Sequence, residues 1–129
     1  MDQNLSDAGA ERAVLSALFQ YGIEAYVEVS DIIDSDTFGS TNNQVLYTCV
    51  EKVIEGNQKV DIPSILSAAS QLGHSERVES NQELQYIKSL FEFPVSQDNV
   101  ISFALQIKKY EFARRIKKLT TKIHKDMDG

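Results

Sequence analysis

A few side chains in this sequence are of types that could hold a metal ion. Residues 34–36 read Asp-Ser-Asp and are followed by Gly39, which resembles the start of a calcium-binding loop. The fifth position of that loop is Phe38, however, and the twelfth is Val45, where the chemistry requires a bidentate glutamate. We therefore expect a capped turn here and no calcium site.

One cysteine and two histidines are the remaining candidates for metal or nucleophile chemistry. Cys49 falls on a helix face that we expect to be buried, His74 in a polar loop and His124 in a basic segment. Their spacing matches neither a metal-ligand set nor a nucleophile paired with a base. The phosphate-cradling loop G-x-x-x-x-G-K-[ST] does not occur either. We expect no catalysis, cofactor or metal in this chain itself.

The charged side chains are distributed unevenly along the 129 residues. Overall, 19 acidic residues outnumber 13 Lys and Arg, for a net charge of −6. Residues 1–107 carry five basic and sixteen acidic side chains, whereas 108–129 carry eight basic and three acidic ones. The net charge argues against a chain that mainly neutralises phosphates. This separation of an acidic segment from a basic one favours contact between copies, or with an acidic partner, at least as much as contact with DNA.

Length and composition indicate one globular domain. With 42% apolar and 25% charged residues, a chain of this size can bury a core without metal or disulfide. The first eleven residues are acidic and polar, unlike a signal peptide. No apolar run approaches the roughly 20 residues of a membrane span. We expect an intracellular protein without membrane contact.

The apolar pattern predicts helices throughout, because the alternation of β-branched residues typical of strands is missing. The expected helices lie at about 8–21, 23–33, 41–55, 61–72, 80–93 and 97–125. The expected end signals are Ser6 or Asp7, Gly22 and Asp61, and capping boxes are expected at 41–44 and 80–83. Phe38 is expected to fill the core from a turn, and residues 74–79 to form a polar loop.

The last helix changes character half way along. Over 100–113 apolar residues cover more than one face, as in a helix packed on a globular body. Beyond that segment only Ile116, Leu119 and Ile123 remain, flanked by basic side chains, which suits a seam against one other helix. An apolar stripe rimmed by charge marks an interface, unless it folds back on its own head.

These patterns together predict an all-α protein with three parts. Residues 1–7 form a disordered tail, 8–95 a compact head of about five short helices, and 96–129 a long, basic helical arm. The residues expected to pair with another helix are Phe112, Ile116, Leu119 and Ile123, with Arg114, Arg115, Lys117 and Lys118 as the charged rim.

Short segments in collinear order, across about residues 10–117, carry a family resemblance. They are AERAVLSAL at 10–18, DTF at 36–38, GNQKVDI at 56–62, LG at 72–73, ELQYIKSL at 83–90, PVS at 94–96, NVISF at 99–103, IKK at 107–109 and RRI at 114–116. As an ordered set they resemble the N-terminal domain of DnaB-type replicative helicases.

The resemblance implies a non-enzymatic collar module. In that family a helical head carries a helical hairpin, hairpins pair into dimers, dimers form the N-terminal ring of a hexamer, and the ring docks primase and possibly a helicase loader. The implied parent is an ATP-dependent DNA helicase, whose C-terminal domain binds ATP and Mg²⁺ and brings contact with single-stranded DNA. The implied location is the cytoplasm of a bacterium or a phage-infected host. We expect this chain to stop before the second hairpin helix.

Two loops depart from the family pattern, and two alternative functions remain. Ser80-Asn81 stand where the family has a Gly-Gly pair, and residues 39–43 replace an aromatic or basic stretch. One alternative is the helicase-binding C-terminal domain of a primase, which shares the fold, although the segment 56–62 favours the helicase. The other is a small DNA-binding protein that uses the basic helix 108–125, with affinity that falls steeply with salt.

Overall fold

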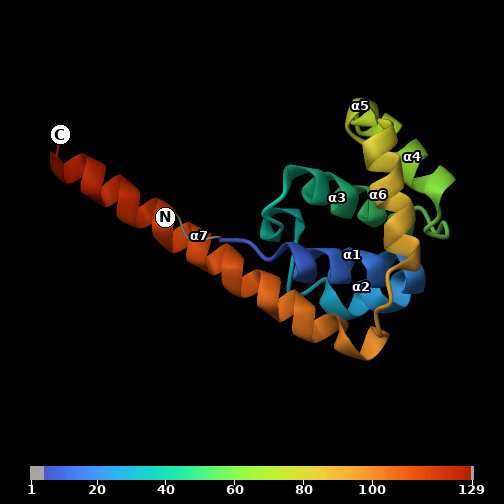
Figure 1. The fold of residues 1–129 in the computed structure, drawn as a ribbon, viewed down its shortest axis with the longest axis horizontal. Helices are drawn as coiled ribbons and strands as arrows, with labels where there is room; N and C mark the ends of the chain where they lie inside the picture. The colour runs from blue at the N-terminus through green and yellow to red at the C-terminus, as the bar shows by residue number, and fades with distance from the viewer. Residues whose placement is uncertain (1–4, 129) are drawn as a thin grey trace.

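The computed structural model describes the backbone of residues 5–128 and the side chains of residues 5–123. Every regular element in that part of the chain is a helix, which confirms the all-α prediction (Figure 1). In chain order the elements are α1 (Ala8–Tyr21), α2 (Ile23–Val29), the 3₁₀-helix η1 (Ser35–Thr37), α3 (Thr41–Glu55), α4 (Ile62–Gln71), α5 (Ser75–Val78), α6 (Asn81–Glu92), the 3₁₀-helix η2 (Gln97–Asn99) and α7 (Val100–Asp128). The head thus has one short helix more than expected.

Helix α1 lies at the centre of the head. Every residue from Ala13 to Phe19 is buried, and α1 contacts α2, α3, α6 and α7. A helix that is buried on all sides needs such a shell of neighbours. Phe38 is fully buried with its ring 5.3 Å from that of Tyr47, as the sequence predicts for a core residue that enters from a turn.

Three local end signals are confirmed. The Asp7 carboxylate accepts a hydrogen bond from the Ala10 N–H at 2.9 Å and caps α1. Gly22 ends α1 with a φ of 60°, a conformation that glycine adopts without strain. At the start of α4, Asp61 and Ser64 cap each other's backbone N–H groups.

The two predicted capping boxes form only in part. Ser40, one residue earlier than predicted, caps α3 by accepting a hydrogen bond from the Asn43 N–H at 3.3 Å. Ser80 caps α6 as predicted, with the Glu83 N–H at 3.2 Å. The Glu83 carboxylate does not reach back to the cap but accepts a hydrogen bond from the Asn42 side chain at 2.8 Å. The side chains expected to close the boxes are used in longer-range contacts.

Two segment predictions are wrong in detail. The helix expected at 23–33 ends at Val29, and the chain turns before it reaches the buried Ile33. Residues 74–79, expected as a polar loop, contain α5, whose Val78 is only 2% exposed. A helix of one turn has only one residue that faces the core. Because the other residues of α5 are polar, the sequence pattern does not indicate a helix here.

Helix α7 has 29 residues and packs on the head only over its first half. Val100, Ala104 and Ile107 are buried, and this half contacts α1, α2 and η1. Residues 115–123 are all exposed, and Figure 1 shows α7 projecting from the head. Among the described helices none is long and apolar enough to cross a membrane.

Candidate protein-interaction surface

The large apolar side chains that stay exposed are confined to two places in the described part of the chain. They lie where α1 meets α2 and on α2 itself, and along α7, but none lies on α3 to α6. The full set is Tyr21, Ile23, Val27, Ile101, Leu105, Phe112, Ile116, Leu119 and Ile123. Apolar surface gathered in this way marks a protein-interaction surface.

The four residues predicted to form the stripe are all exposed on α7. Their exposed fractions run from 47% for Ile116 to 66% for Phe112, with Leu119 and Ile123 between them. The alternative in which the stripe folds back on its own head is therefore wrong, because the head covers none of these side chains. Their pairing with another helix stays a prediction.

Ile101 and Leu105 extend the stripe towards the head, contrary to the sequence-based expectation for the run 100–113. They are 42% and 55% exposed. A helix turns by about 100° per residue, so the residues that follow Val100 and Ala104 point away from the buried face. The sequence shows that this run is apolar on several faces. Which of these faces contacts the head depends on the orientation of α7 relative to the head.

The predicted charged rim divides between solvent and head. Arg115, Lys117 and Lys118 are exposed beside the stripe, and the Arg115 Nη2 donates to the Glu111 carboxylate at 2.8 Å. Arg114 is not part of this rim, because its guanidinium reaches across to the head.

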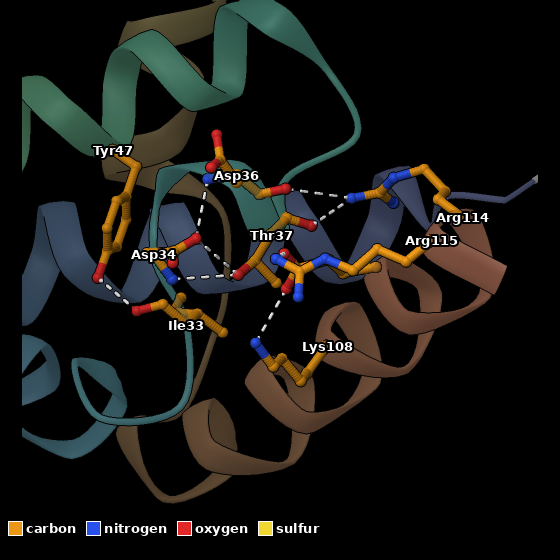
Figure 2. Close-up of polar contacts among 9 residues, drawn as sticks. Ile33, Asp34, Asp36, Thr37, Tyr47, Lys108, Arg114 and Arg115 are labelled. Atoms are coloured by element: carbon orange, nitrogen blue, oxygen red, sulfur yellow. Dashed lines mark hydrogen bonds and ion pairs between the residues drawn. The ribbon is translucent and has the colours of Figure 1, made fainter. Parts of the chain in front are cut away.

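Arg114 fastens α7 to two other segments through backbone carbonyls. Its Nη2 donates to the carbonyl oxygens of Thr37 at 2.8 Å and of Asp36 at 3.4 Å, both in η1, as Figure 2 shows. Its Nη1 donates to the carbonyl oxygen of Leu5 at 2.8 Å. A planar guanidinium with five N–H donors is suited to several acceptors at once. The tail predicted at residues 1–7 thus contacts α7 at Leu5, and residues 1–4 lie outside the described residues.

Glu111 is a buried charge on the same part of α7. Its side chain is 4% exposed and pairs with the Lys108 Nζ at 3.0 Å and the Arg115 Nη2 at 2.8 Å (Figure 2). Burial raises the pKa of Glu111, but hydrogen bonds from Lys108 and Thr37 and the charges of Lys108 and Arg115 outweigh it, and the pKa ends below its ordinary value. Glu111 is therefore ionised at neutral pH.

A second buried carboxylate, Glu11 on α1, organises the loop before α3. Its Oε2 accepts a hydrogen bond from the Gly39 N–H at 2.7 Å, and its Oε1 accepts one from the Asn43 side chain at 2.8 Å. The Tyr86 hydroxyl in turn donates to the Asn43 Oδ1 at 2.9 Å. At Gly39 an added Cβ would lie 2.7 Å from the Ser6 Cβ, so the close approach of these segments requires glycine.

Helix α2 presents an acidic face beside its exposed apolar residues. Ile23 and Val27, 57% and 65% exposed, are one turn apart. Glu24 and Asp31 are exposed and Glu28 is half-buried. Among the described side chains none forms an ion pair with these three acids. The apolar residues of α2 thus have a negative rim without counter-ions.

The acidic surface continues onto α3. The Tyr26 hydroxyl donates to the Glu51 Oε2 at 3.0 Å. Burial, this hydrogen bond, and the negative charges of Glu51 and Glu55 raise the pKa of Tyr26 to about 12. Burial also raises the pKa of Glu51, and the charges of Glu55 and Asp34 add to the effect. Burial is the larger cause of both shifts, and the neighbouring carboxylates add a negative potential.

The residues first considered for metal or nucleophile chemistry do not come together. Asp34 accepts a hydrogen bond from the Asp36 N–H at 3.0 Å, which confirms the predicted capped turn. Cys49 is buried, as predicted, and burial raises the pKa of its thiol to about 11. His74 is half-buried, and the side chain of His124 lies outside the described residues. No group of three His, Cys, Asp or Glu among the described residues could hold a metal ion.

A hollow of about 350 Å³ lies at the junction of α1 and α2. Its apolar lining comes from Phe19, Tyr21, Ile23, Ile54 and Val60, beside polar groups of the segment 57–59. It holds no carboxylate, histidine or cysteine, so it offers shape and apolar surface rather than catalytic groups.

Comparison with protein-family models matches residues 3–109 to the DnaB-like helicase N-terminal domain. The chain belongs to this family. No curated protein matches it. The crystal structure of the N-terminal domain of DnaB helicase from Mycobacterium tuberculosis is similar in fold, with a TM-score of 0.86 and 16% identity, covering 98% of this chain and 89% of that chain.

As a DnaB-like helicase N-terminal domain, the chain is a non-catalytic part of an ATP-dependent helicase and lacks the nucleotide-binding site. The match decides against the alternative of a primase domain. The family model ends at residue 109, so the stripe from Phe112 onward lies outside it, whereas the structural likeness covers nearly the whole chain.

The starts of α3 and α6, near the two segments that the sequence analysis singled out, contact each other. Asn42, in the segment that replaces the aromatic or basic stretch, donates to the Glu83 carboxylate at 2.8 Å, just after Ser80-Asn81. The next residue, Asn43, accepts a hydrogen bond from the hydroxyl of Tyr86, which lies one turn beyond Glu83 on α6. These two hydrogen bonds join the start of α3 to α6.

Proposed function

We propose that this domain is the N-terminal collar of a hexameric replicative DNA helicase, in which it joins subunits through α7 and docks primase, and possibly a helicase loader, through the head. Family membership supports the replication context. In this proposal the domain acts in the cytoplasm, and contact with single-stranded DNA belongs to the full-length protein.

The exposed stripe on α7 is the observation that carries the oligomerisation role. Phe112, Ile116, Leu119 and Ile123 place four large apolar side chains in solvent along three turns of a projecting helix. Because these side chains are 47–66% exposed, burying them against an equivalent helix would gain about half of the roughly 1.5–3 kcal/mol that full burial of such a side chain contributes. Arg115, Lys117 and Lys118 keep the rim soluble while the stripe is unpaired.

Sedimentation equilibrium of this chain, over a wide concentration range and at two salt concentrations, tests the proposal. We expect dimerisation that persists at high salt, because apolar burial is not screened. Phe112→Asp should reduce the association constant by at least about a hundredfold, since a carboxylate would be buried without a partner.

Thr121→Asp on the opposite face of α7 is the matched control and should associate like the parent. Circular dichroism checks that both variants keep the helical head. Equal association of Phe112→Asp and the parent, or a parent that stays monomeric at all concentrations, would contradict the assignment of the stripe.

A further inference from the structure

Helix α2 has an outer side that the described part of the chain leaves uncovered. A helix turns by about 100° per residue, so the exposed Ile23 and Val27 lie only about 40° apart on this side. Ala25 and Val29, which are fully buried, lie on the opposite side and attach α2 to the head. Ile23 and Val27 therefore form a short apolar ridge that points away from the packed side of α2.

The hollow at the junction of α1 and α2 continues this ridge. Ile23 belongs to both, and the lining of the hollow extends to Ile54 near the end of α3 and to Val60 beyond it. Apolar residues one turn apart on a partner helix could enter the hollow and contact the ridge at the same time. We call the ridge of Ile23 and Val27, together with the hollow, the α2 face.

Carboxylates border the α2 face on both sides. On one side lie Glu24 and Glu28, about 80° and 120° around α2 from the middle of the ridge. On the other side lies Tyr26, whose hydroxyl donates to Glu51 of α3 at 3.0 Å. The charge of Glu55, one turn further along α3, also reaches Tyr26. The apolar surface is thus enclosed between two acidic borders.

These carboxylates have no counter-ion among the described side chains. Both ion pairs in that part of the chain join Glu111 to other residues of α7. Lys59 lines the hollow, but it is exposed and forms no ion pair with the acidic borders. Charge complementarity across an interface favours a partner of opposite sign and disfavours one of the same sign. The partner that fits this surface is therefore basic as well as apolar.

The fold also indicates the shape of the partner. Every regular element in residues 5–128 is a helix, so the described chain has no sheet edge to which an extended peptide could add as a strand. The short distance between ridge and hollow instead matches an amphipathic helix, whose apolar anchors recur every three or four residues. Basic residues on the flanks of such a helix would face the two acidic borders.

We propose that the α2 face is the docking site on the head for a cationic amphipathic helix of another protein. One apolar side chain of that helix occupies the hollow, another one turn away packs on Val27, and lysines or arginines on its flanks pair with Glu24 and Glu28 on one side and with Glu51 and Glu55 on the other. This inference rests on the proposed docking role of the head, to which it adds a position and a partner chemistry.

A designed peptide probes the site. It is a helical peptide of leucine and lysine, with its leucines on one side, and a scrambled peptide of the same composition is its control. Fluorescence anisotropy measures the binding of each labelled peptide to the full chain. The amphipathic peptide should bind at least about tenfold more tightly, because only it presents apolar anchors and charge together. No binding, or equal binding of the two peptides, would overturn the proposal.

Two double variants locate the binding on the α2 face. Ile23→Ser with Val27→Ser, and separately Glu24→Lys with Glu28→Lys, should each weaken binding of the amphipathic peptide about tenfold or more. The loss in the charge variant should shrink at high salt, whereas the loss in the apolar variant should persist. Circular dichroism and urea unfolding check that both variants keep the folded head. Parent-like binding by both folded variants would exclude the α2 face as the site.

The matched control is Glu76→Lys with Glu79→Lys on α5, which makes the same change in net charge on a part of the head away from α2 (Figure 1). It should bind the peptide within about twofold of the parent. A tenfold loss in this control would mean that the peptide responds only to overall charge, and would overturn the site.

Sedimentation equilibrium separates this proposal from the oligomerisation role. Glu24→Lys with Glu28→Lys should self-associate like the parent. If this variant loses association as Phe112→Asp is expected to, the α2 face is covered by a second copy, and the proposal of a separate partner is wrong. Phe112→Asp should bind the peptide like the parent, and a tenfold loss there would place the peptide on the stripe instead. Peptide binding to a chain that stays monomeric would support the docking site although the oligomerisation role had failed.

Discussion

Two buried glutamates connect segments that are far apart in the sequence. Glu11 joins α1 to the loop before α3, and Glu111 pairs with Lys108 and Arg115 on α7 and accepts a hydrogen bond from Thr37 of η1. A buried carboxylate is tolerated only where hydrogen bonds or charges compensate for lost hydration. Both sites supply such partners, so each fixes the position of a loop relative to a helix.

Glu11→Ala is expected to lower the free energy of unfolding by about 2–4 kcal/mol, because it leaves the Gly39 N–H and the buried Asn43 side-chain amide without an acceptor. Glu92→Ala, an exposed glutamate on α6, should change it by less than about 0.5 kcal/mol. Urea unfolding at one protein concentration measures both. Similar small losses in the two variants would show that the Glu11 network is not stabilising.

Single side chains such as these mark the limit of prediction from sequence. A charged residue in a helical pattern is assigned to the surface by default, and the partners of Glu11 are 28 and 32 residues away. The same default assigns Arg114 to a solvent-exposed rim, whereas its acceptors are the carbonyls of Leu5 and Thr37. Backbone acceptors leave no trace in side-chain patterns, so only the three-dimensional fold reveals them.

At the scale of elements, α7 is one continuous helix with two environments. Its first half packs on α1, α2 and η1, and its second half is solvent-exposed. Arg114 lies at the boundary and holds the last contact with the head. The adjacent Arg115 makes only a surface ion pair, with a side chain 64% exposed. These two neighbours form a natural comparison.

Arg114→Ala should lower the free energy of unfolding by about 1–3 kcal/mol, because two of its hydrogen bonds to backbone carbonyls are charge-assisted and short. Arg115→Ala should cost less than about 1 kcal/mol, as exposed ion pairs do. Hydrogen exchange should also show faster opening of η1 only in the first variant. Equal effects of the two substitutions would show that Arg114 does not fasten α7 to η1.

Most elements could be predicted because their signals are local. Asp7, Gly22 and Asp61 act within one turn of the helix ends that they determine. The apolar pattern likewise showed the change in α7 near residue 114. Helix α5 could not be predicted from one core position, Val78, and the exposure of Ile101 and Leu105 depends on the angle at which α7 crosses the head.

At the scale of the whole molecule, the stability of the projecting half of α7 depends on what packs against it. Residues 115–128 continue α7 as a single helix that projects from the head, and the described side chains of 115–123 are all exposed (Figure 1). The packed half of α7 already provides the nucleus for this segment, but most helix stability in proteins comes from tertiary packing, and the head packs on none of the described residues 115–123. The projecting half of α7 therefore needs a neighbour to be persistently helical, and its exposed stripe is the surface through which a neighbour can stabilise it.

Association should therefore order the projecting half of α7. In dilute solution, amides of residues 115–128 should exchange within about tenfold of the rate of an unstructured chain, while those of α1 stay protected. At concentrations where the chain dimerises, protection of the same amides should rise at least about tenfold. Phe112→Asp should show no such rise at any concentration. Strong protection of residues 115–128 in this variant would mean that the helix is stable alone, and that pairing does not depend on coupled ordering of the arm.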